Sequence, residues 1–336
     1  MTIPVKAKLI PVLLALSALL ALPAAASATL SYVKYGHYPF APKVFTADDD
    51  GFDDIAIGRG TEPEVSPDGE FVAYVSARGK RERLKVKRVY GGPADLLMDA
   101  ARISSVTWSP ESNRIAAVRA PARGPEKLVL INVPSGGGEH LIARGEFGRV
   151  SWSPEGDQLV YSRVRGGGSD IFRFAVGGHG SKRLTYDHRS QAPLWGPSGR
   201  IAFLKQVGKR RKLEIFTMES DGGEVRRLTH TRHVRSRRGL YPVDWSPDGT
   251  RLLANYSVRG GEFGVIVYAR TGALGRLLHR KAHFVATAFS CDGNLVLGSR
   301  GPSGPVANHK VGVVPVGSGT MQVLAGFAYD PDMDGC

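Results

Sequence analysis

Short runs of alternating apolar and polar residues recur along the chain, and each follows a tight turn. Examples are "EFVAYVS" (residues 70–76), "QLVYS" (158–162) and "RLLANYS" (251–257). A period of two residues predicts half-buried β-strands rather than helices. A strand such as "DIFRFAV" (170–176), a Gly-rich turn and a last strand such as "KRLT" (182–185) come next. The pattern therefore predicts an all-β chain built from units of four antiparallel strands.

The turn before each run is a variant of Trp-Ser-Pro-Asp-Gly. Pro suits the second position of a type I turn, Asp tolerates the third and Gly closes it. Six copies occur, and the positions that hold Ser or its replacement are Ser66, Ser109, Ser153, Gly196, Ser246 and Ser290. They are 43, 44, 43, 50 and 44 residues apart. A repeat of this length and content is typical of one blade of a β-propeller.

At these residues the chain resembles the TolB-like family of WD-like propeller repeats, whose blades combine this turn with an "IF" strand and a terminal "RRLT". The resemblance covers essentially everything after residue 28. The copies depart from the pattern at Val65, Ser112, Gly196, Phe289 and Cys291. The family's namesake carries an N-terminal α/β domain. Since only about 30 residues lie between residue 28 and the first turn, we expect no such domain here.

The two ends of the chain decide the number of blades. Residues 30–36 and 42–58 resemble the second, third and fourth strands of a blade, and residues 327–335 resemble an innermost strand with its turn at Tyr329–Asp332. We expect a propeller of seven four-stranded blades, with the N- and C-terminal strands sharing one blade, because this closure leaves no open sheet edge. Six blades with an N-terminal extension is the alternative.

Residues 1–28 have the layout of a secretory signal peptide. Lys6 and Lys8 precede an apolar stretch over residues 9–22, and Ala26-Ser27-Ala28 offers a small-residue cleavage site. An uncleaved anchor is the alternative. We expect residues 29–336 to form a single propeller domain, exported to the periplasm, the cell surface or the medium, with no transmembrane segment after cleavage.

The chain is basic, with 45 Lys and Arg against 31 Asp and Glu and a formal charge of +14. Such a balance favours anionic partners, and export makes nucleic acid an unsuitable one. Propeller topology places the loops after the second and fourth strands on one face, which we expect to bind a partner. The basic residues of this face are Lys80, Arg81, Arg83, Lys209, Arg210, Arg211, Lys212, Arg235, Arg237 and Arg238. Ordinary solvated loops are the alternative.

Residues 46–54, "TADDDGFDD", resemble the calcium loop of FG-GAP propeller repeats. The resemblance implies that Asp48, Asp50 and Asp54 bind through carboxylates and Phe52 through its carbonyl. Thr46 stands where a first carboxylate is expected, and an acidic hairpin turn is the alternative. We expect no required cofactor beyond this structural calcium ion.

Cys291 and Cys336 are the only cysteines in the chain. Both fall in the inner turns of neighbouring blades in the seven-bladed arrangement. We therefore expect a disulfide between them that locks the closure, which an oxidising compartment permits.

Catalytic signatures are weak in this sequence. No G-x-S-x-G elbow occurs, and the Ser residues of the repeats are turn formers. We therefore expect no enzyme, but a monomeric, exported scaffold that binds a protein partner in the cell envelope or outside the cell. Binding of an anionic envelope glycan or lipid through the basic face is the alternative. A propeller lyase or hydrolase is a third candidate.

Overall fold

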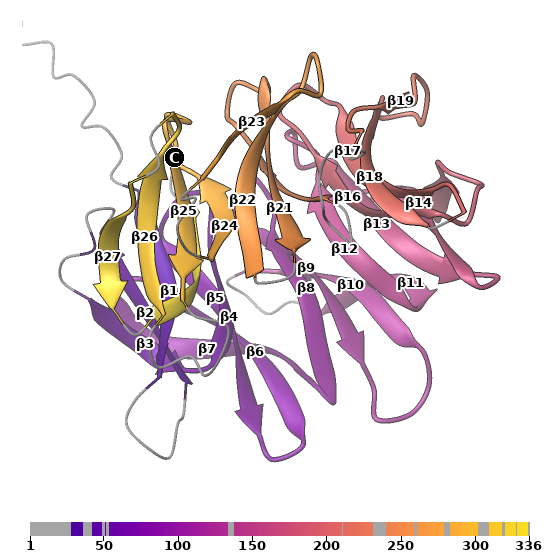
Figure 1. The fold of residues 1–336 in the computed structure, drawn as a ribbon. Helices are drawn as coiled ribbons and strands as arrows, with labels where there is room; N and C mark the ends of the chain where they lie inside the picture. Colours follow the sequence, from indigo (N-terminus) through magenta and orange to yellow (C-terminus); the bar gives the residue numbers. More distant parts are fainter. Residues whose placement is uncertain are drawn as a thin grey trace, which may run out of the picture.

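The computed structural model describes residues 28–35, 42–48, 51, 54–133, 138–209, 211–230, 240–258, 261–278, 283–301, 309–317, 320–326 and 328–334. In these residues the chain forms 28 β-strands, arranged as blades around a central axis (Figure 1). The prediction of an all-β propeller is confirmed. Among the described residues, none belongs to a helix long and apolar enough to span a membrane. Residues 1–27, and with them nearly all of the expected signal peptide, lie outside the described residues.

The blades are numbered along the chain, starting with the one that both termini share. Blade 1 has the strand order β28 (Ala328–Asp334), β1 (Thr29–Tyr35), β2 (Pro42–Asp48), β3 (Ile55–Arg59). Blade 2 comprises β4 (Thr61–Val65), β5 (Phe71–Arg78), β6 (Arg81–Arg88) and β7 (Gly91–Ala100). Blade 3 comprises β8 (Arg102–Trp108), β9 (Arg114–Ala120), β10 (Glu126–Asn132) and β11 (Glu139–Gly145). Blade 4 comprises β12 (Phe147–Trp152), β13 (Gln158–Arg165), β14 (Gly168–Ala175) and β15 (Ser181–Arg183).

The remaining three blades repeat this order. Blade 5 comprises β16 (Ser190–Trp195), β17 (Ile201–Val207), β18 (Lys212–Met218) and β19 (Arg226–Arg227). Blade 6 comprises β20 (Leu240–Trp245), β21 (Arg251–Val258), β22 (Gly261–Tyr268) and β23 (Leu274–Leu277). Blade 7 comprises β24 (Phe284–Phe289), β25 (Leu295–Arg300), β26 (Lys310–Pro315) and β27 (Gln322–Gly326). A parallel bridge between Phe263 and Phe284 links blades 6 and 7.

The core lies between the blades rather than within them. The described residues contain seven clusters of buried apolar side chains, and each cluster is shared by two neighbouring blades. The indole of Trp108 donates a hydrogen bond of 3.0 Å to the Glu64 carbonyl of the preceding blade. Trp152 reaches the Thr107 carbonyl at 3.2 Å in the same way. Trp245 bonds the Leu194 carbonyl at 3.4 Å, so three of the Trp residues tie an inner strand to the one before it, whereas Trp195 bonds Gly199 of its own turn.

The turn of the repeat is held by its own side chains. In the first copy the Gly69 amide donates to the Ser66 carbonyl at 2.7 Å, and the Ser66 hydroxyl donates to Asp68 at 2.5 Å. Gly69 has a φ of 71°, which a residue with a Cβ rarely adopts. These bonds explain why Ser, Asp and Gly recur at their positions.

The C-terminal copy of the repeat has a different register from the expected one. Tyr329–Asp332 lie inside β28, which pairs with β1, and do not form a turn. Asp330 has a φ of 52°, close to the 51° of Glu62, which lies three residues before the Trp position of blade 2. Met333, 9% exposed, therefore takes the place of Trp. Asp-Pro-Asp favours a turn locally, but pairing with β1 keeps the segment extended.

Candidate functional site in the central channel

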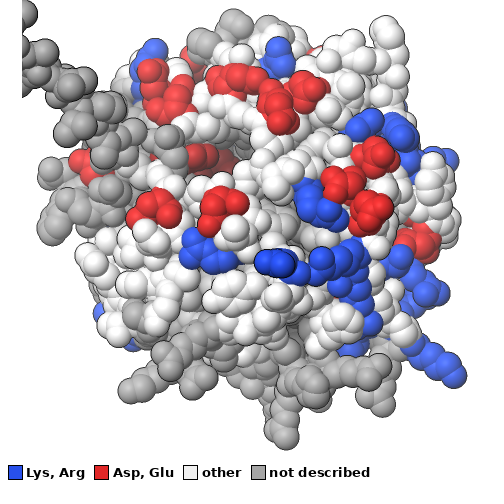
Figure 2. All heavy atoms as spheres, turned by 90° about the horizontal axis from the view of Figure 1, so that it is seen from above, with Lys and Arg blue, Asp and Glu red and all other residues white. Residues whose placement is uncertain are grey.

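The inner strands enclose a cavity of about 610 Å³ along the axis of the ring. It is lined by residues of β4, β8, β12, β16, β20, β24 and β28, so all seven blades contribute. Figure 2 looks along this axis and shows acidic side chains gathered around a central hollow. The volume of the cavity lies within the range of about 300–1,000 Å³ that is usual for ligand sites.

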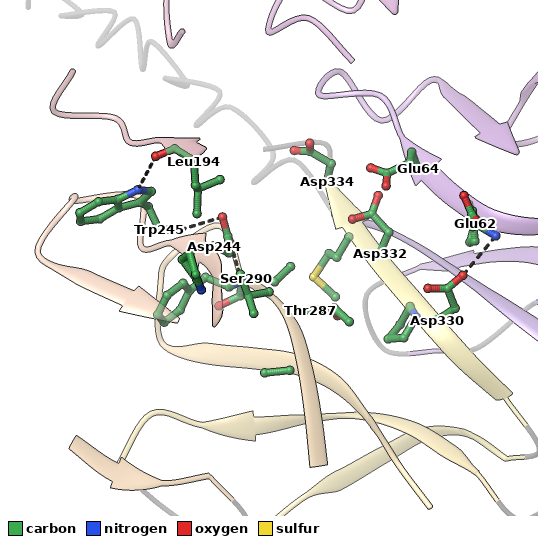
Figure 3. A pocket seen from close by; sticks show the side chains of 18 of the residues that line it. Glu62, Glu64, Leu194, Asp244, Trp245, Thr287, Ser290, Asp330, Asp332 and Asp334 are labelled. Carbon is green, nitrogen blue, oxygen red and sulfur yellow. Dashed lines mark hydrogen bonds between the residues drawn. The ribbon is translucent and has the colours of Figure 1, made fainter. Parts of the chain in front are cut away.

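Two adjacent inner strands form an acidic wall of this cavity. The acidic wall consists of Glu62 and Glu64 of β4 with Asp330, Asp332 and Asp334 of β28 (Figure 3). Asp332 accepts the Val65 amide at 2.7 Å. Asp330 accepts the Glu62 amide at 3.1 Å. These bonds to backbone amides fix the carboxylates without neutralising their charge.

Asp244 of β20 is the sixth acidic residue that lines the cavity. It accepts the backbone amides of Trp245 and Phe289, both at 2.8 Å. Asp244 and Asp332 occupy the same position of the repeat, directly before the Trp position, and each bridges to the next blade. Ser151 does the same through its hydroxyl, which accepts the Trp195 amide at 3.0 Å.

The position of these side chains follows from the inner strands. Each inner strand carries a shift of register against its neighbour, the mark of a β-bulge. A bulge redirects the side chains next to it, and here residues beside the bulges line the cavity. Alternate positions on a strand are about 7 Å apart. The acidic wall therefore presents a row of charges along the channel rather than a single point.

Burial disturbs the acidity of the wall. Burial and the like charge of Asp334 raise the pKa of Asp332 to about 7. Burial raises the pKa of Asp244 to about 6, against the opposing effect of its amide hydrogen bonds and Arg149. Burial and the charges of Asp332 and Asp330 raise the pKa of Glu64 well above its usual range. A cation in the channel would relieve this repulsion.

Arg149 of β12 is the one basic residue among the described residues that line the cavity. Its Nη1 donates to the Pro242 carbonyl at 2.7 Å and its Nη2 to the Val243 carbonyl at 2.6 Å. Blade 4 is thereby linked to blade 6 across the channel, past blade 5. Burial lowers the pKa of this guanidinium, and the charges of Asp244 and Glu64 oppose that change.

The described residues of the cavity do not form an obvious metal-binding site. Within the described ranges, no three His, Cys, Asp or Glu side chains are grouped so that they could hold one metal ion. The cavity lining also contains no His among those residues. What the arrangement can do is bind positive charge that is spread along the axis.

The residues of the expected basic face have different surroundings. Lys80, Lys209 and Arg211 are exposed, and Lys212 is half-buried. Arg81 and Arg83 form ion pairs with Asp99, the second with Nε to Oδ2 at 3.0 Å. Arg210, Arg235, Arg237 and Arg238 lie outside the described residues. Partner binding by this face stays a prediction.

The expected calcium loop is described in part. Asp48 ends β2, while Asp50 and Phe52 lie outside the described residues. Asp54 accepts a hydrogen bond of 2.5 Å from the Tyr32 hydroxyl and pairs with Lys34. Burial acts to raise the pKa of Asp54, but its bonds with Lys34 and Tyr32 outweigh this effect and lower it. Calcium would have to displace Lys34, and calcium binding stays a prediction.

The expected disulfide also stays a prediction. Cys291 lies in the inner turn of blade 7 and lines the cavity, whereas Cys336 lies outside the described residues. Intact-mass measurement with and without reductant tests the pair: we expect a gain of two hydrogens on reduction. Two thiols in the untreated protein would contradict it.

The acidic wall was not predicted from the sequence. A signal existed: Glu64 and Asp244 both directly precede the Trp position of their repeats. Asp332 directly precedes Met333 in the same way, but the turn expected at Tyr329–Asp332 placed the Trp position at Tyr329, four residues before Met333.

Comparisons with known proteins agree with this architecture. The family model for the TolB β-propeller domain matches residues 22–237, more than half of the chain. TolB from Acinetobacter baumannii is similar over 90% of this chain and 82% of its own, with a TM-score of 0.59 and 16% identity. The β-propeller domain of the Trilobed protease from Pyrococcus furiosus, whose topology is described as an open velcro, is similar over 89% of this chain and 92% of its own, with a TM-score of 0.68 and 16% identity. These two likenesses show the fold alone.

A curated relative is similar over a shorter range. The uncharacterized peptidase YuxL of Bacillus subtilis (strain 168) is 30% identical over 95 residues. That match covers 28% of this chain and only 14% of the relative's length.

Proposed function

Since the chain belongs to the TolB β-propeller family, we propose that it is an exported, non-catalytic scaffold that binds a protein partner. The partner contributes an extended segment with Lys or Arg side chains, and this segment enters the central channel. The observation that carries the proposal is the acidic wall of β4 and β28.

The spacing of the wall supports an extended segment. Alternate side chains of an extended peptide are about 7 Å apart, as are alternate side chains of β4 and β28. Each carboxylate of the acidic wall, such as Glu64 or Asp332, could therefore bind one cationic side chain of the partner's extended segment, which we call the guest. A hydrogen bond to a charged group contributes about 1.5–3 kcal/mol, so two such contacts give measurable affinity.

The test uses the peptide acetyl-Gly-Arg-Gly-Arg-Gly-amide with a fluorescent label. Fluorescence anisotropy measures its affinity for the wild type, for the double variant Glu64→Gln/Asp332→Asn, and for Glu70→Gln. Glu70 follows the turn between β4 and β5, is not among the residues that line the cavity, and pairs with Arg88. We expect the double variant to lose about 10- to 100-fold in affinity, equal to about 1.4–2.8 kcal/mol, and Glu70→Gln to bind like the wild type. Equal affinity in all three proteins would refute the proposal.

The second candidate is an anionic glycan or lipid bound by the basic face. It is favoured by exposed Lys80, Lys209 and Arg211, which form no ion pair with any carboxylate of the described chain. Cosedimentation with vesicles of phosphatidylglycerol tests it. We expect binding that falls steeply with salt and is weakened by Lys80→Glu/Lys209→Glu. Vesicle binding unchanged in that variant would remove this candidate.

A further inference from the structure

The position of Arg149 is unusual for a basic residue in an acidic cavity. A guanidinium usually approaches carboxylates, in pairs of parallel hydrogen bonds. Arg149 instead uses both terminal nitrogens on the consecutive carbonyls of Pro242 and Val243, 93 and 94 residues away in the sequence. No carboxylate among the described residues forms an ion pair with it. Its charge is thus held in the channel and not cancelled by a direct contact.

The place where Arg149 is held explains this choice of partners. β12 and β20 are the inner strands of blades 4 and 6, which flank blade 5, whereas the acidic wall belongs to blades 1 and 2. The two carbonyls hold the guanidinium at β20, while Asp244 and Glu64 act on it only through their charge. The channel therefore has an acidic wall at β4 and β28 and a carbonyl wall at β20 whose acceptors already bind Arg149.

We infer that Arg149 competes with the cationic side chains of the guest. It thereby confines the guest to the acidic wall and limits the affinity of the guest for the channel. This inference rests on the proposed function. Two effects act in the same direction. The guanidinium occupies carbonyl acceptors that a cationic side chain of the guest would otherwise use, and its charge repels a like charge inside a cavity where screening by water is reduced.

The experiment measures the affinity of acetyl-Gly-Arg-Gly-Arg-Gly-amide for Arg149→Gln and Arg149→Lys, with thermal unfolding as a check that each variant folds. Gln removes the charge and retains one amide donor for a carbonyl. Lys retains the charge but cannot bond to both carbonyls in the same plane. We expect Arg149→Gln to bind about tenfold more tightly than the wild type, a gain of about 1.4 kcal/mol. Arg149→Lys should remain much nearer to the wild type.

A variant that retains Arg149 itself keeps the inference testable if Arg149→Gln fails to fold. Ser105 lines the same cavity on β8, and Ser105→Lys adds a second positive charge there. We expect its affinity to be about tenfold weaker, again by like-charge repulsion.

The possible outcomes separate the two proposals. Wild-type binding that Arg149→Gln leaves unchanged or weakens would overturn the competitor role while the proposed function stands. Equal tightening by Gln and Lys would also overturn it, because the effect would then come from opening the channel and not from charge. If neither the wild type nor Arg149→Gln binds the peptide, the proposed function and the competitor role are both wrong.

Discussion

Asp332→Asn is expected to stabilise the protein at alkaline pH although it changes a half-buried residue of the acidic wall. Partial burial of Asp332 and the like charge of Asp334 raise its pKa from the ordinary 3.8 to about 7. The folded chain therefore holds this proton more tightly than the unfolded chain does. The stability gained from that proton is fully present below pH 3.8 and is lost as the pH rises to about 7.

The size of the effect follows from the shift. A difference of about three pH units at 1.36 kcal/mol per unit gives about 4 kcal/mol as the upper limit for the wild type. Asn cannot ionise, and its amide oxygen can still accept the Val65 amide that Asp332 accepts at 2.7 Å. We therefore expect the stability of Asp332→Asn relative to the wild type to rise by about 2–4 kcal/mol between about pH 4 and about pH 8.

Urea unfolding followed by circular dichroism at several pH values measures this difference. Asp248→Asn is the matched control with the opposite sign. The bonds of Asp248 with Ser246 and Thr250 lower its pKa to about 2, so its contribution is present above pH 3.8 and is lost as the pH falls toward 2. A stability difference for Asp332→Asn that does not vary with pH, or that becomes more unfavourable at alkaline pH, would refute the reasoning.

Two further substitutions test the packing between blades and within them. Gly196→Ser restores the usual Ser of the repeat, yet we expect it to lower the free energy of unfolding by about 1–3 kcal/mol, because a Cβ at Gly196 would lie 2.8 Å from the Trp245 ring. Chemical unfolding measures this loss, with Gly326→Ala as the control, since a Cβ at Gly326 meets nothing within 4 Å. Equal stability of the two variants would contradict the prediction. Arg183→Leu should lower the free energy of unfolding by about 3–5 kcal/mol, because Arg183 bonds the fully buried carboxylate of Asp170 at 2.6 Å. An unfolding midpoint equal to that of the wild type would show that the pair does not stabilise blade 4.

The repeat predicted the fold because its signals are local. Each turn needs Pro and Gly for its backbone angles, and each strand shows a period of two residues, so both are legible from a single copy. The β1–β3 strands of blade 1 were also predicted, because residues 30–36 and 42–58 resemble the outer three strands of a blade. The register of β28 was wrong, since Asp-Pro-Asp favours a turn locally and becomes a strand through its pairing with β1.

The acidic wall could not be predicted from such local signals. Glu64 and Asp332 are more than 260 residues apart in the sequence, and they meet because the termini share a blade. Whether a residue of an inner strand faces the axis also depends on the bulge, which has no fixed residue type. The +14 charge of the chain pointed to anionic partners, whereas the channel has the opposite sign. Net charge describes the whole surface and not the lining of one cavity.

The central claim is that the channel recognises positive charge. Isothermal titration calorimetry of the wild type with acetyl-Gly-Arg-Gly-Arg-Gly-amide, and with the same peptide carrying citrulline in place of both Arg residues, tests it most directly. Citrulline retains the length and shape of Arg but has no charge. The account predicts saturable binding of the Arg peptide, tighter at about pH 8 than at about pH 6 because Asp332 and Asp244 ionise in that range, and no binding of the citrulline peptide. Equal affinities for the two peptides would contradict it.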